Sequence, residues 1–411
     1  MTAWRDSRAT LHTLDLRNMT LWTLGRNWTQ TLTVLTALGH DLQQCPNLSR
    51  LDFGGTFQFS GMFAAFVKGV CTGHGLLKLT HFAITMVGNV NEDASSVGPM
   101  QNFLSAVPCI SHLALQSSVH NDVIPCLEHT QLESLQLAKN IFQGRGAQRL
   151  GQLLPKLYAL TDLDISKTEL TDACLAHLAL GLHGCPRLRT ANLAGCMVRH
   201  QATSDGVCAV MRALATRKHL THLDLSMNEL SVQAMAVFAG NVRKDSPLRH
   251  FNVMDTFWQD GIMQHVVKIV LACSALHTLD VRRNRVGRDD LATLLRMSNK
   301  PCSVRELRLS GIALGWQGVQ WLREAQPCFA RLMRLELVRC DVGDDGAKIF
   351  AECVSGWPAL QHVDLSYNEI MSAGGVALAE AQKDAAWKLT AGNNFMSREV
   401  KQRLCKQGCV A

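Results

Sequence analysis

The stretch Leu276-His-Thr-Leu279-Asp-Val281 carries the pattern that decides the fold, because aliphatic residues stand at its first, fourth and sixth positions. Further clear copies are Leu160-Thr-Asp-Leu163-Asp-Ile165, Leu220-Thr-His-Leu223-Asp-Leu225 and Leu360-Gln-His-Val363-Asp-Leu365. Copies open at Leu11, Leu48, Leu79, Ile110, Leu132, Leu160, Leu188, Leu220, Leu248, Leu276, Val304, Leu332 and Leu360, and a degenerate copy ends at Leu389. From Leu220 onward every step between openings is 28 residues. A period of this length is typical of a solenoid.

Each copy joins a strand pattern to a helix pattern. The apolar and polar residues alternate within the motif, which predicts a short strand with one buried face. Apolar residues then return at helical spacing, as at Leu291, Leu294 and Leu295. Between the two patterns, the ninth position is often a residue able to bond the backbone of a departing strand: Asn140, Cys196, Asn228, Asn284, Cys340 and Asn368. We therefore expect one strand and one helix per repeat.

These motifs resemble leucine-rich repeats of the ribonuclease-inhibitor type, over roughly residues 10–395. The resemblance implies an α/β solenoid of about 13–14 repeats, shaped as a horseshoe, with a parallel inner sheet and outer helices. In this family the concave sheet usually meets a protein partner. Relatives include ribonuclease inhibitors, activators of the Ran GTPase, immune-receptor sensor domains and components of cilia. The resemblance is specific for the fold and weak for the function.

Length and composition fit a single large solenoid. The 411 residues are 47% apolar, which suffices for a large core. Repeats add by stacking and set no upper size, so a second globular domain is not required. We expect a leucine-rich-repeat domain over residues 1–395, with an irregular N-terminal third and a loop insertion near residues 87–100. A capping helix should follow over residues 396–411, where Ser397 can cap its first turn.

The fifteen cysteines are expected to be reduced thiols in an intracellular, cytoplasmic protein. Their number is odd, the chain is long, and the N-terminus has no apolar signal core. Arginines and threonines before Asp41 leave a mitochondrial presequence open. No metal site or cofactor is expected, because Cys405 and Cys409 lack a second pair of ligands. No apolar run reaches the roughly 18–20 residues that span a bilayer.

The fifth position of each motif forms the best-defined exposed column. It contains Asp164, Asp224 and Asp280, most of its other members are acidic or amide residues, and Lys388 is expected as its last member. Five histidines stand two places earlier: His81, His112, His222, His250 and His362. This pattern predicts an acidic floor edged by imidazoles, suited to a basic or polar partner. Aspartate is also ordinary at this position in such repeats, so a purely solvated face remains the alternative.

Positive charge is concentrated in the stretch from Leu276 to Cys340, which has twelve basic and six acidic residues. This stretch therefore carries six of the seven net positive charges of the chain. We expect the residues of this arginine band to cluster on one edge and on the inner surface of three adjacent repeats: Arg282, Arg283, Arg285, Arg305, Arg308, Arg334 and Arg339. They would bind an acidic protein surface. RNA is less favoured because few aromatic residues are near for stacking, and a solvated basic face is the structural alternative.

Trp258 and Trp316 follow strands by a few residues and are further candidates. An exposed tryptophan at either position would anchor a partner. A packed tryptophan would instead plug a loop, and we slightly favour this second interpretation. No phosphate-binding loop, HExxH motif or nucleophile elbow occurs. No catalytic arginine of a Ran activator can be placed in this sequence.

The sequence thus predicts a non-enzymatic protein-binding scaffold or adaptor that uses the concave face. One alternative is a structural subunit of a large assembly, such as a cilium or flagellum or an organellar ribosome. A less favoured alternative is a small-GTPase activator. Neither the partner nor the oligomeric state follows from the sequence.

Overall fold

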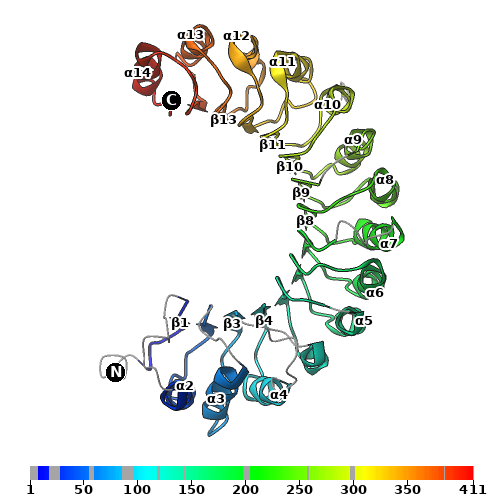
Figure 1. The fold of residues 1–411 in the computed structure, drawn as a ribbon, viewed down its shortest axis with the longest axis vertical. Coiled ribbons are helices and arrows are strands. Elements are labelled where there is room, and N and C mark those ends of the chain that lie inside the picture. The colour runs from blue at the N-terminus through cyan, green and yellow to red at the C-terminus, as the bar shows by residue number, and fades with distance from the viewer. Residues whose placement is uncertain are drawn as a thin grey trace. The chain divides into compact units, whose positions relative to one another are not determined.

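The computed structural model describes residues 8–17, 28–54, 60–85, 97–117, 121–142, 144–197, 204–256, 259–296, 301–383 and 385–410. The chain divides into two compact units, Met1–Ala213 and Leu214–Ala411. Each unit is described by itself. In both, the strands lie along the inner side and the helices along the outer side (Figure 1).

Unit 1 contains seven strands in the described residues. They are β1 (Thr13–Asp15), β2 (Arg50–Asp52), β3 (His81–Thr85), β4 (His112–Gln116), β5 (Ser134–Gln136), β6 (Asp162–Asp164) and β7 (Thr190–Asn192). The outer segments are α2 (Trp28–Leu42), α3 (Ser60–Val70), α4 (Val97–Ala106), the 3-10 helix η4 (Asn121–Leu127), α5 (Gly144–Leu153), the 3-10 helix η5 (Leu154–Lys156) and α6 (Asp172–His183). The division between the units falls within α7 (Ser204–Ala215).

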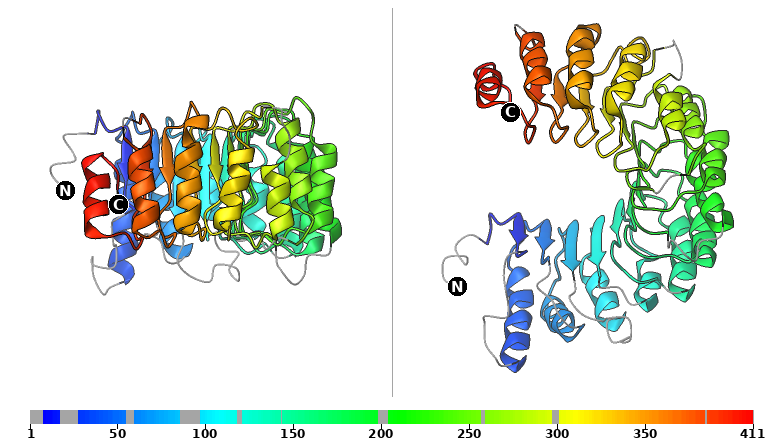
Figure 2. Two further views of the ribbon diagram at one scale, coloured as in Figure 1. Left: turned by 90° about the horizontal axis from the view of Figure 1, so that it is seen from above. Right: turned by 45° about the horizontal axis from the view of Figure 1, so that its top comes forward.

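Unit 2 also contains seven described strands. They are β8 (His222–Asp224), β9 (His250–Asn252), β10 (Thr278–Asp280), β11 (Glu306–Arg308), β12 (Arg334–Glu336), β13 (His362–Asp364) and β14 (Lys388–Thr390). The outer segments are α8 (Val232–Asn241), α9 (Met263–Ala272), α10 (Arg288–Leu295), α11 (Gly315–Glu324), α12 (Gly343–Cys353), the 3-10 helix η6 (Val354–Gly356), α13 (Ser372–Ala381) and α14 (Arg398–Lys406). Figure 2 shows α11 to α14 standing side by side along the outer side.

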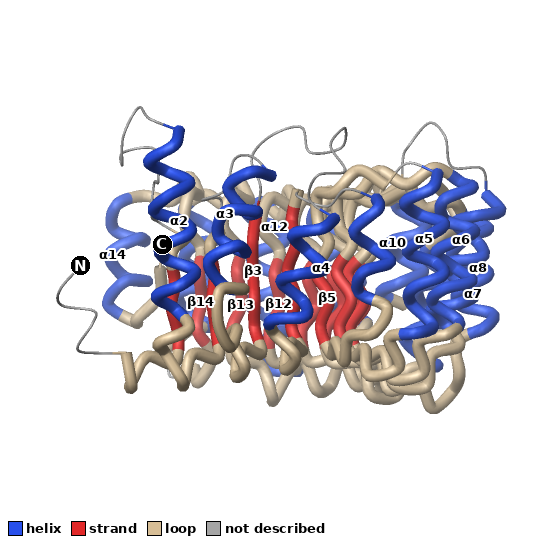
Figure 3. The backbone as a smooth tube through the Cα atoms, turned by 90° about the horizontal axis from the view of Figure 1, so that it is seen from below, coloured by secondary structure: helices blue, strands red, loops and turns tan. Residues whose placement is uncertain are grey.

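Neighbouring strands are parallel and pair at equivalent motif positions. In unit 2, Leu279 pairs with Phe251 on one side and Leu307 on the other. All three middle side chains are buried, since this face of the sheet packs against the helices. The strands β12, β13 and β14 run side by side in the same way (Figure 3). The predicted α/β class, a repeat solenoid with a parallel inner sheet and outer helices, is confirmed.

Buried asparagines bond the backbone where the chain leaves each strand. Asn284 donates its amide to the carbonyl oxygens of Val253 and Val281, both at 2.8 Å. Its Oδ1 accepts from the Thr256 N–H at 2.8 Å. Further members that donate to strand-end carbonyls are Asn140, Asn228, Asn368 and Asn394. The role predicted for the ninth motif position is confirmed, and Asn394 extends it to the last repeat.

The unequal repeat lengths have local causes. The short step from Ile110 to Leu132 contains η4 in place of an α-helix, with Pro125 inside it. The longest step, from Leu11 to Leu48, contains the 15-residue helix α2. The predicted end of the loop near residues 87–100 is wrong, because the helix α4 begins at Val97. Its other residues, 87–96, lie outside the described part.

The last repeat also differs from the expectation. The sequence analysis placed Lys388 in the aspartate column, but Lys388 pairs with His362, and Thr390 pairs with Asp364. Beyond this strand, the Ser397 hydroxyl accepts from the Val400 N–H at 3.4 Å at the start of α14. Val400 and Leu404 are buried. The assignment of residues 396–411 as a capping segment stays a prediction.

We predict that Asn368→Ala lowers the free energy of unfolding by about 2–4 kcal/mol, because it leaves several buried backbone groups without a partner. The Asn368 Oδ1 accepts from the N–H groups of Cys340 and Val342 at 2.8 and 3.3 Å, and its amide donates to two carbonyls. Chemical denaturation of the full chain measures the change. The exposed Asn241→Ala should cost less than about 0.5 kcal/mol. Equal effects of the two variants would contradict a structural role for the buried amides.

We also predict that Gly69→Ala destabilises unit 1 by about 1–3 kcal/mol, because it overpacks the contact between α2 and α3. A Cβ at Gly69 would lie 2.0 Å from the Thr36 carbonyl oxygen. The matched control is Gly98→Ala in α4, where nothing lies within 4 Å. This control should be neutral or stabilising by up to about 1 kcal/mol, since alanine favours a helix. Thermal denaturation of both variants decides, and a stable Gly69→Ala protein would refute the close packing.

Candidate functional site

Two rows of side chains cross the inner face of the sheet in each unit. The first-position row takes the first residue of each strand, and the third-position row takes the third. In unit 1 the first-position row is Thr13, Arg50, His81, His112, Ser134, Asp162 and Thr190. Its third-position row is Asp15, Asp52, Ala83, Ala114, Gln136, Asp164 and Asn192. In unit 2 the first-position row is His222, His250, Thr278, Glu306, Arg334, His362 and Lys388. Its third-position row is Asp224, Asn252, Asp280, Arg308, Glu336, Asp364 and Thr390. The sequence analysis therefore identified both rows correctly, apart from Lys388.

The acids of the third-position row are engaged in the turns that follow their strands. The Asp164 Oδ1 accepts from the Ser166 N–H at 2.9 Å. The Asp224 Oδ1 accepts from the N–H and the hydroxyl of Ser226, at 2.8 and 2.6 Å. The other oxygen of Asp224 accepts from the Asn252 amide at 2.8 Å. These carboxylates close local turns, so the expected acidic floor has much of its hydrogen-bonding capacity occupied. A partner role for Asp164 and Asp224 stays a prediction.

Asp280 is the most buried charge of the row, with 2% of its surface exposed. Arg282 forms a two-point ion pair with it, through Nη2 at 2.6 Å and Nε at 2.9 Å. Arg308 reaches the same carboxylate at 3.4 Å. Hydrogen bonding to Asp280 raises the pKa of Arg282 above its usual range. A carboxylate this buried requires such pairing, because an unpaired buried charge is strongly destabilising.

Two glutamates complete this network on the adjacent strands. Glu336 accepts from Arg282 at 3.2 Å and from the Ser310 hydroxyl at 2.9 Å. Glu306 accepts from Arg308 at 2.9 Å and lies 3.5 Å from Arg334. Arg282 and Arg308 therefore each contact two or more acids. Although both lie on the inner surface as predicted, their charge is compensated within the chain.

The rest of the arginine band lies along two edges of the sheet, not one as expected. Arg283, Arg285 and Arg339 follow strands and lie at the carboxyl edge, where the strands end. Arg305 precedes β11 and Arg334 opens β12, so both lie at the amino edge. Because all strands are parallel, residues before and after them reach opposite edges. The expectation of a single clustered edge is therefore wrong.

Side chains at the carboxyl edge are turned outward by left-handed backbone. Arg283, Arg339 and Tyr367 occupy equivalent turn positions with φ of 58°, 56° and 60°. Arg283 is exposed and lies 4.0 Å from Asp255. The Arg339 guanidinium lies 4.7 Å from the centre of the Tyr367 ring, a cation–π contact. Arg285 is exposed at the same edge.

The two tryptophan candidates have different outcomes. Trp316 lies in the first turn of α11 with 48% of its surface exposed, so the slightly favoured loop plug is wrong for this residue. Trp258 lies outside the described residues. No cluster of three metal-ligating side chains occurs in the described ranges. Within those ranges, no helix has the length and apolar character needed to cross a membrane.

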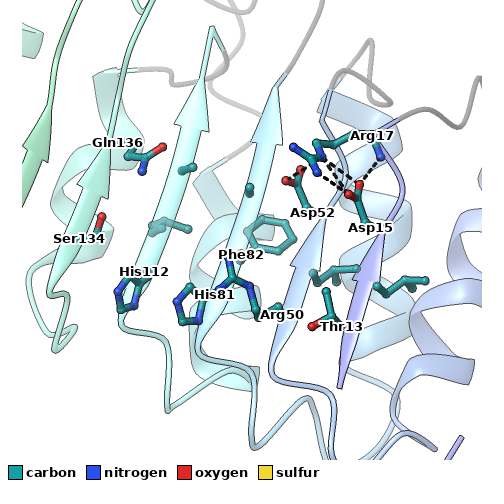
Figure 4. Close-up of a pocket in the computed structure, with 15 residues that line it drawn as sticks. Thr13, Asp15, Arg17, Arg50, Asp52, His81, Phe82, His112, Ser134 and Gln136 are labelled. Carbon is teal, nitrogen blue, oxygen red and sulfur yellow. Dashed lines mark hydrogen bonds and ion pairs between the residues drawn. The ribbon is translucent and has the colours of Figure 1, made fainter. Parts of the chain in front are cut away.

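Sequence analysis missed a hollow of about 390 Å³ on the inner face of unit 1 (Figure 4). Ala83 and Ala114 form its floor in the third-position row, where most neighbouring repeats have a longer polar residue. On one side Arg17 pairs with Asp15 at 2.6 Å and lies 3.5 Å from Asp52. The alanines in an otherwise polar column were the available signal in the sequence.

Stacked imidazoles form the other side of this hollow. The rings of His81 and His112 lie 3.9 Å apart and nearly parallel (Figure 4). Each Nδ1 is hydrogen-bonded to the hydroxyl of the preceding residue, Thr80 at 2.8 Å or Ser111 at 2.9 Å. Partial burial lowers the pKa of His81, and the nearby His112 and Arg50 lower it further. The hollow thus offers an apolar floor between a salt-bridged wall and two stacked rings.

Comparisons with known proteins follow the same repeats. The family model for the leucine-rich repeat matches residues 217–239, 332–351 and 358–379. Mouse ribonuclease inhibitor is 27% identical over 281 residues, which cover 67% of this chain and 54% of that protein. The zebrafish (Danio rerio) Tonsoku-like protein is 30% identical over 231 residues, covering 55% of this chain and 14% of that protein. This chain thus spans about half of the first relative and far less of the second.

Solved structures with similar folds have low sequence identity to this chain. The yeast complex of Rad7 and Elc1 contains a chain with a TM-score of 0.49 and 12% identity, covering 90% of this chain and 91% of that one. LegL7 from Legionella pneumophila has a TM-score of 0.46 and 17% identity, covering 79% of this chain and 97% of that one. The fold, the matched repeats and the similarity to ribonuclease inhibitor support a leucine-rich-repeat protein of the ribonuclease-inhibitor-like type.

Proposed function

We propose that this chain is a non-enzymatic scaffold that binds a protein partner on the inner face of its sheet. The hollow of unit 1 is the observation that carries the proposal. It lies on a face built from rigid, hydrogen-bonded strands, so its side chains are positioned before a partner arrives. Preorganised surfaces of this kind lose less conformational entropy on binding. The similarity to ribonuclease inhibitor, whose name states that it inhibits a ribonuclease, supports the same class of function.

The chemistry of the hollow favours a mixed polar and apolar contact. The small side chains of Ala83 and Ala114 leave space for a side chain of the partner, and the neighbouring Phe82 is buried. The stacked rings of His81 and His112 present a flat surface beside that space. A partner side chain placed there would be desolvated at the centre of the contact, and such central positions contribute most of the binding energy in protein interfaces.

A role as a subunit of a large assembly predicts a different stoichiometry. An adaptor retains one dominant partner in near-equal amounts when it is purified from its own cells. A structural subunit co-purifies with many proteins of one machine. We propose the adaptor role, since the hollow of unit 1 is one compact site that suits a single partner.

We predict that the double variant Ala83→Arg, Ala114→Arg reduces the recovered partner at least about tenfold, because two long side chains fill the hollow. The measurement is affinity purification of the tagged full chain, with quantitative mass spectrometry of the co-purifying proteins. Leu180→Arg is the matched control, since Leu180 is exposed on the outer helix α6. This control should retain the partner. Identical recovery with the double variant and the control would refute binding at the hollow.

A further inference from the structure

Unit 2 carries a second surface feature along its amino edge. A basic residue stands just before each of the strands β9, β10 and β11, and another is the first residue of each of the strands β12, β13 and β14. We call these residues the basic lane: Arg249, His277, Arg305, Arg334, His362 and Lys388. Only Arg305 and Arg334 belong to the arginine band inferred from the sequence.

Backbone hydrogen bonds fix the order of the lane. The His277 N–H donates to the Arg249 carbonyl at 2.8 Å, and the Arg305 N–H donates to the His277 carbonyl at 2.8 Å. Strand pairing then brings Arg334, His362 and Lys388 side by side. Parallel strands are about 4.8 Å apart, so the lane places one basic side chain about every 5 Å.

The charge of the lane is largely uncompensated. Arg249, Arg305 and Lys388 form no ion pair with an acid in the described part of unit 2, whereas Arg282 and Arg308 each have several. Glu306 directly follows Arg305 in the chain, and Arg308 and Arg334 already contact it. The pKa of His277 is lowered by partial burial and by the positive charges of Arg305 and Arg249.

A shallow hollow of about 690 Å³ borders the lane at Arg305. Its lining includes Met333, Pro358, Ala359 and Ala386, which give it an apolar character. The lane therefore combines four exposed cations, Arg249, Arg305, Arg334 and Lys388, with an adjacent site for an apolar side chain. Such a pairing of charge and apolar contact is typical of a site that orients a polypeptide segment.

We propose that the basic lane binds an acidic segment of a protein partner, with carboxylates facing the lane and an apolar side chain in the hollow at Met333. The inference rests on the proposed scaffold function and specifies the chemistry of a partner. A helix fits the spacing, because side chains three or four residues apart lie about 5–6 Å from each other. RNA is disfavoured, since the described lane residues include no tyrosine, phenylalanine or tryptophan on which bases could stack.

The test uses the full chain and a labelled alanine-based helical peptide with a glutamate at every fourth position and one leucine. Fluorescence anisotropy should detect binding of this peptide and at least about tenfold weaker binding of its glutamine counterpart. The triple variant Arg249→Gln, Arg305→Gln, Lys388→Gln should weaken binding of the glutamate peptide at least about tenfold. Circular dichroism verifies folding, which these exposed side chains should not affect.

The matched control removes three exposed basic residues of the outer helices α9, α12 and α14: Lys268→Gln, Lys348→Gln, Arg398→Gln. Binding within about twofold of the unchanged chain supports the lane, because both triple variants remove the same net charge. Equal weakening by both triples would overturn the proposal and leave only net charge as the cause. A single-stranded RNA that binds more tightly than the peptide, and loses that binding in the lane variant, would also overturn it.

The two functional proposals can fail separately. If the lane variant binds the glutamate peptide as the unchanged chain does, the lane proposal is wrong. Partner recovery by the Ala83 and Ala114 double variant still decides the scaffold proposal in that case, because those residues lie in unit 1. Conversely, the lane variant could weaken peptide binding while the Ala83 and Ala114 double variant retains the partner. The partner site would then not include the hollow.

Discussion

The rest of the structure depends on how a three-residue strand is held in register. Such a strand makes few ladder hydrogen bonds, so its ends would leave backbone groups buried without partners. Asn284 and Asn368 solve this problem by donating to carbonyls on two successive repeats and by accepting N–H groups from the preceding turn. Each amide thus joins one repeat to the next. This bond, together with the buried middle residue of each strand, fixes which side chains reach the inner face.

That register also determines how charge is distributed. A carboxylate at the third strand position is placed to accept the N–H two residues later, as Asp164 and Asp224 do. Acids there contribute to the fold. First-position residues have no equivalent turn, so their side chains extend over the face. His81 and His112 use only Nδ1 locally, and Lys388 is exposed without an acidic partner among the described residues. The first-position row is therefore better suited to contact a partner than the aspartate column, which the sequence suggested as an acidic floor.

Roles that depend on position within one repeat could be predicted from the sequence, whereas contacts between distant repeats could not. Leu279, Leu291 and Asn284 were assigned correctly because their roles depend on position within one repeat. The contact of Arg282 with Glu336 was not predicted, because Glu336 lies 54 residues away in sequence. Lys388 was misplaced because its step from His362 is 26 residues and not 28, which shifts the strand by two positions.

The hollow in unit 1 shows a second limit. Ala83 and Ala114 are visible in the sequence, but a small residue creates space only if its neighbours do not lean into it. Arg17 could have crossed the floor; its ion pairs with Asp15 and Asp52 hold it at the side. Stacking likewise keeps the rings of His81 and His112 against each other. The floor thus stays open because the side chains around it already have interaction partners of their own. The same reasoning separates the basic lane from the arginine band: a charge can serve a partner only where the fold has not already used it.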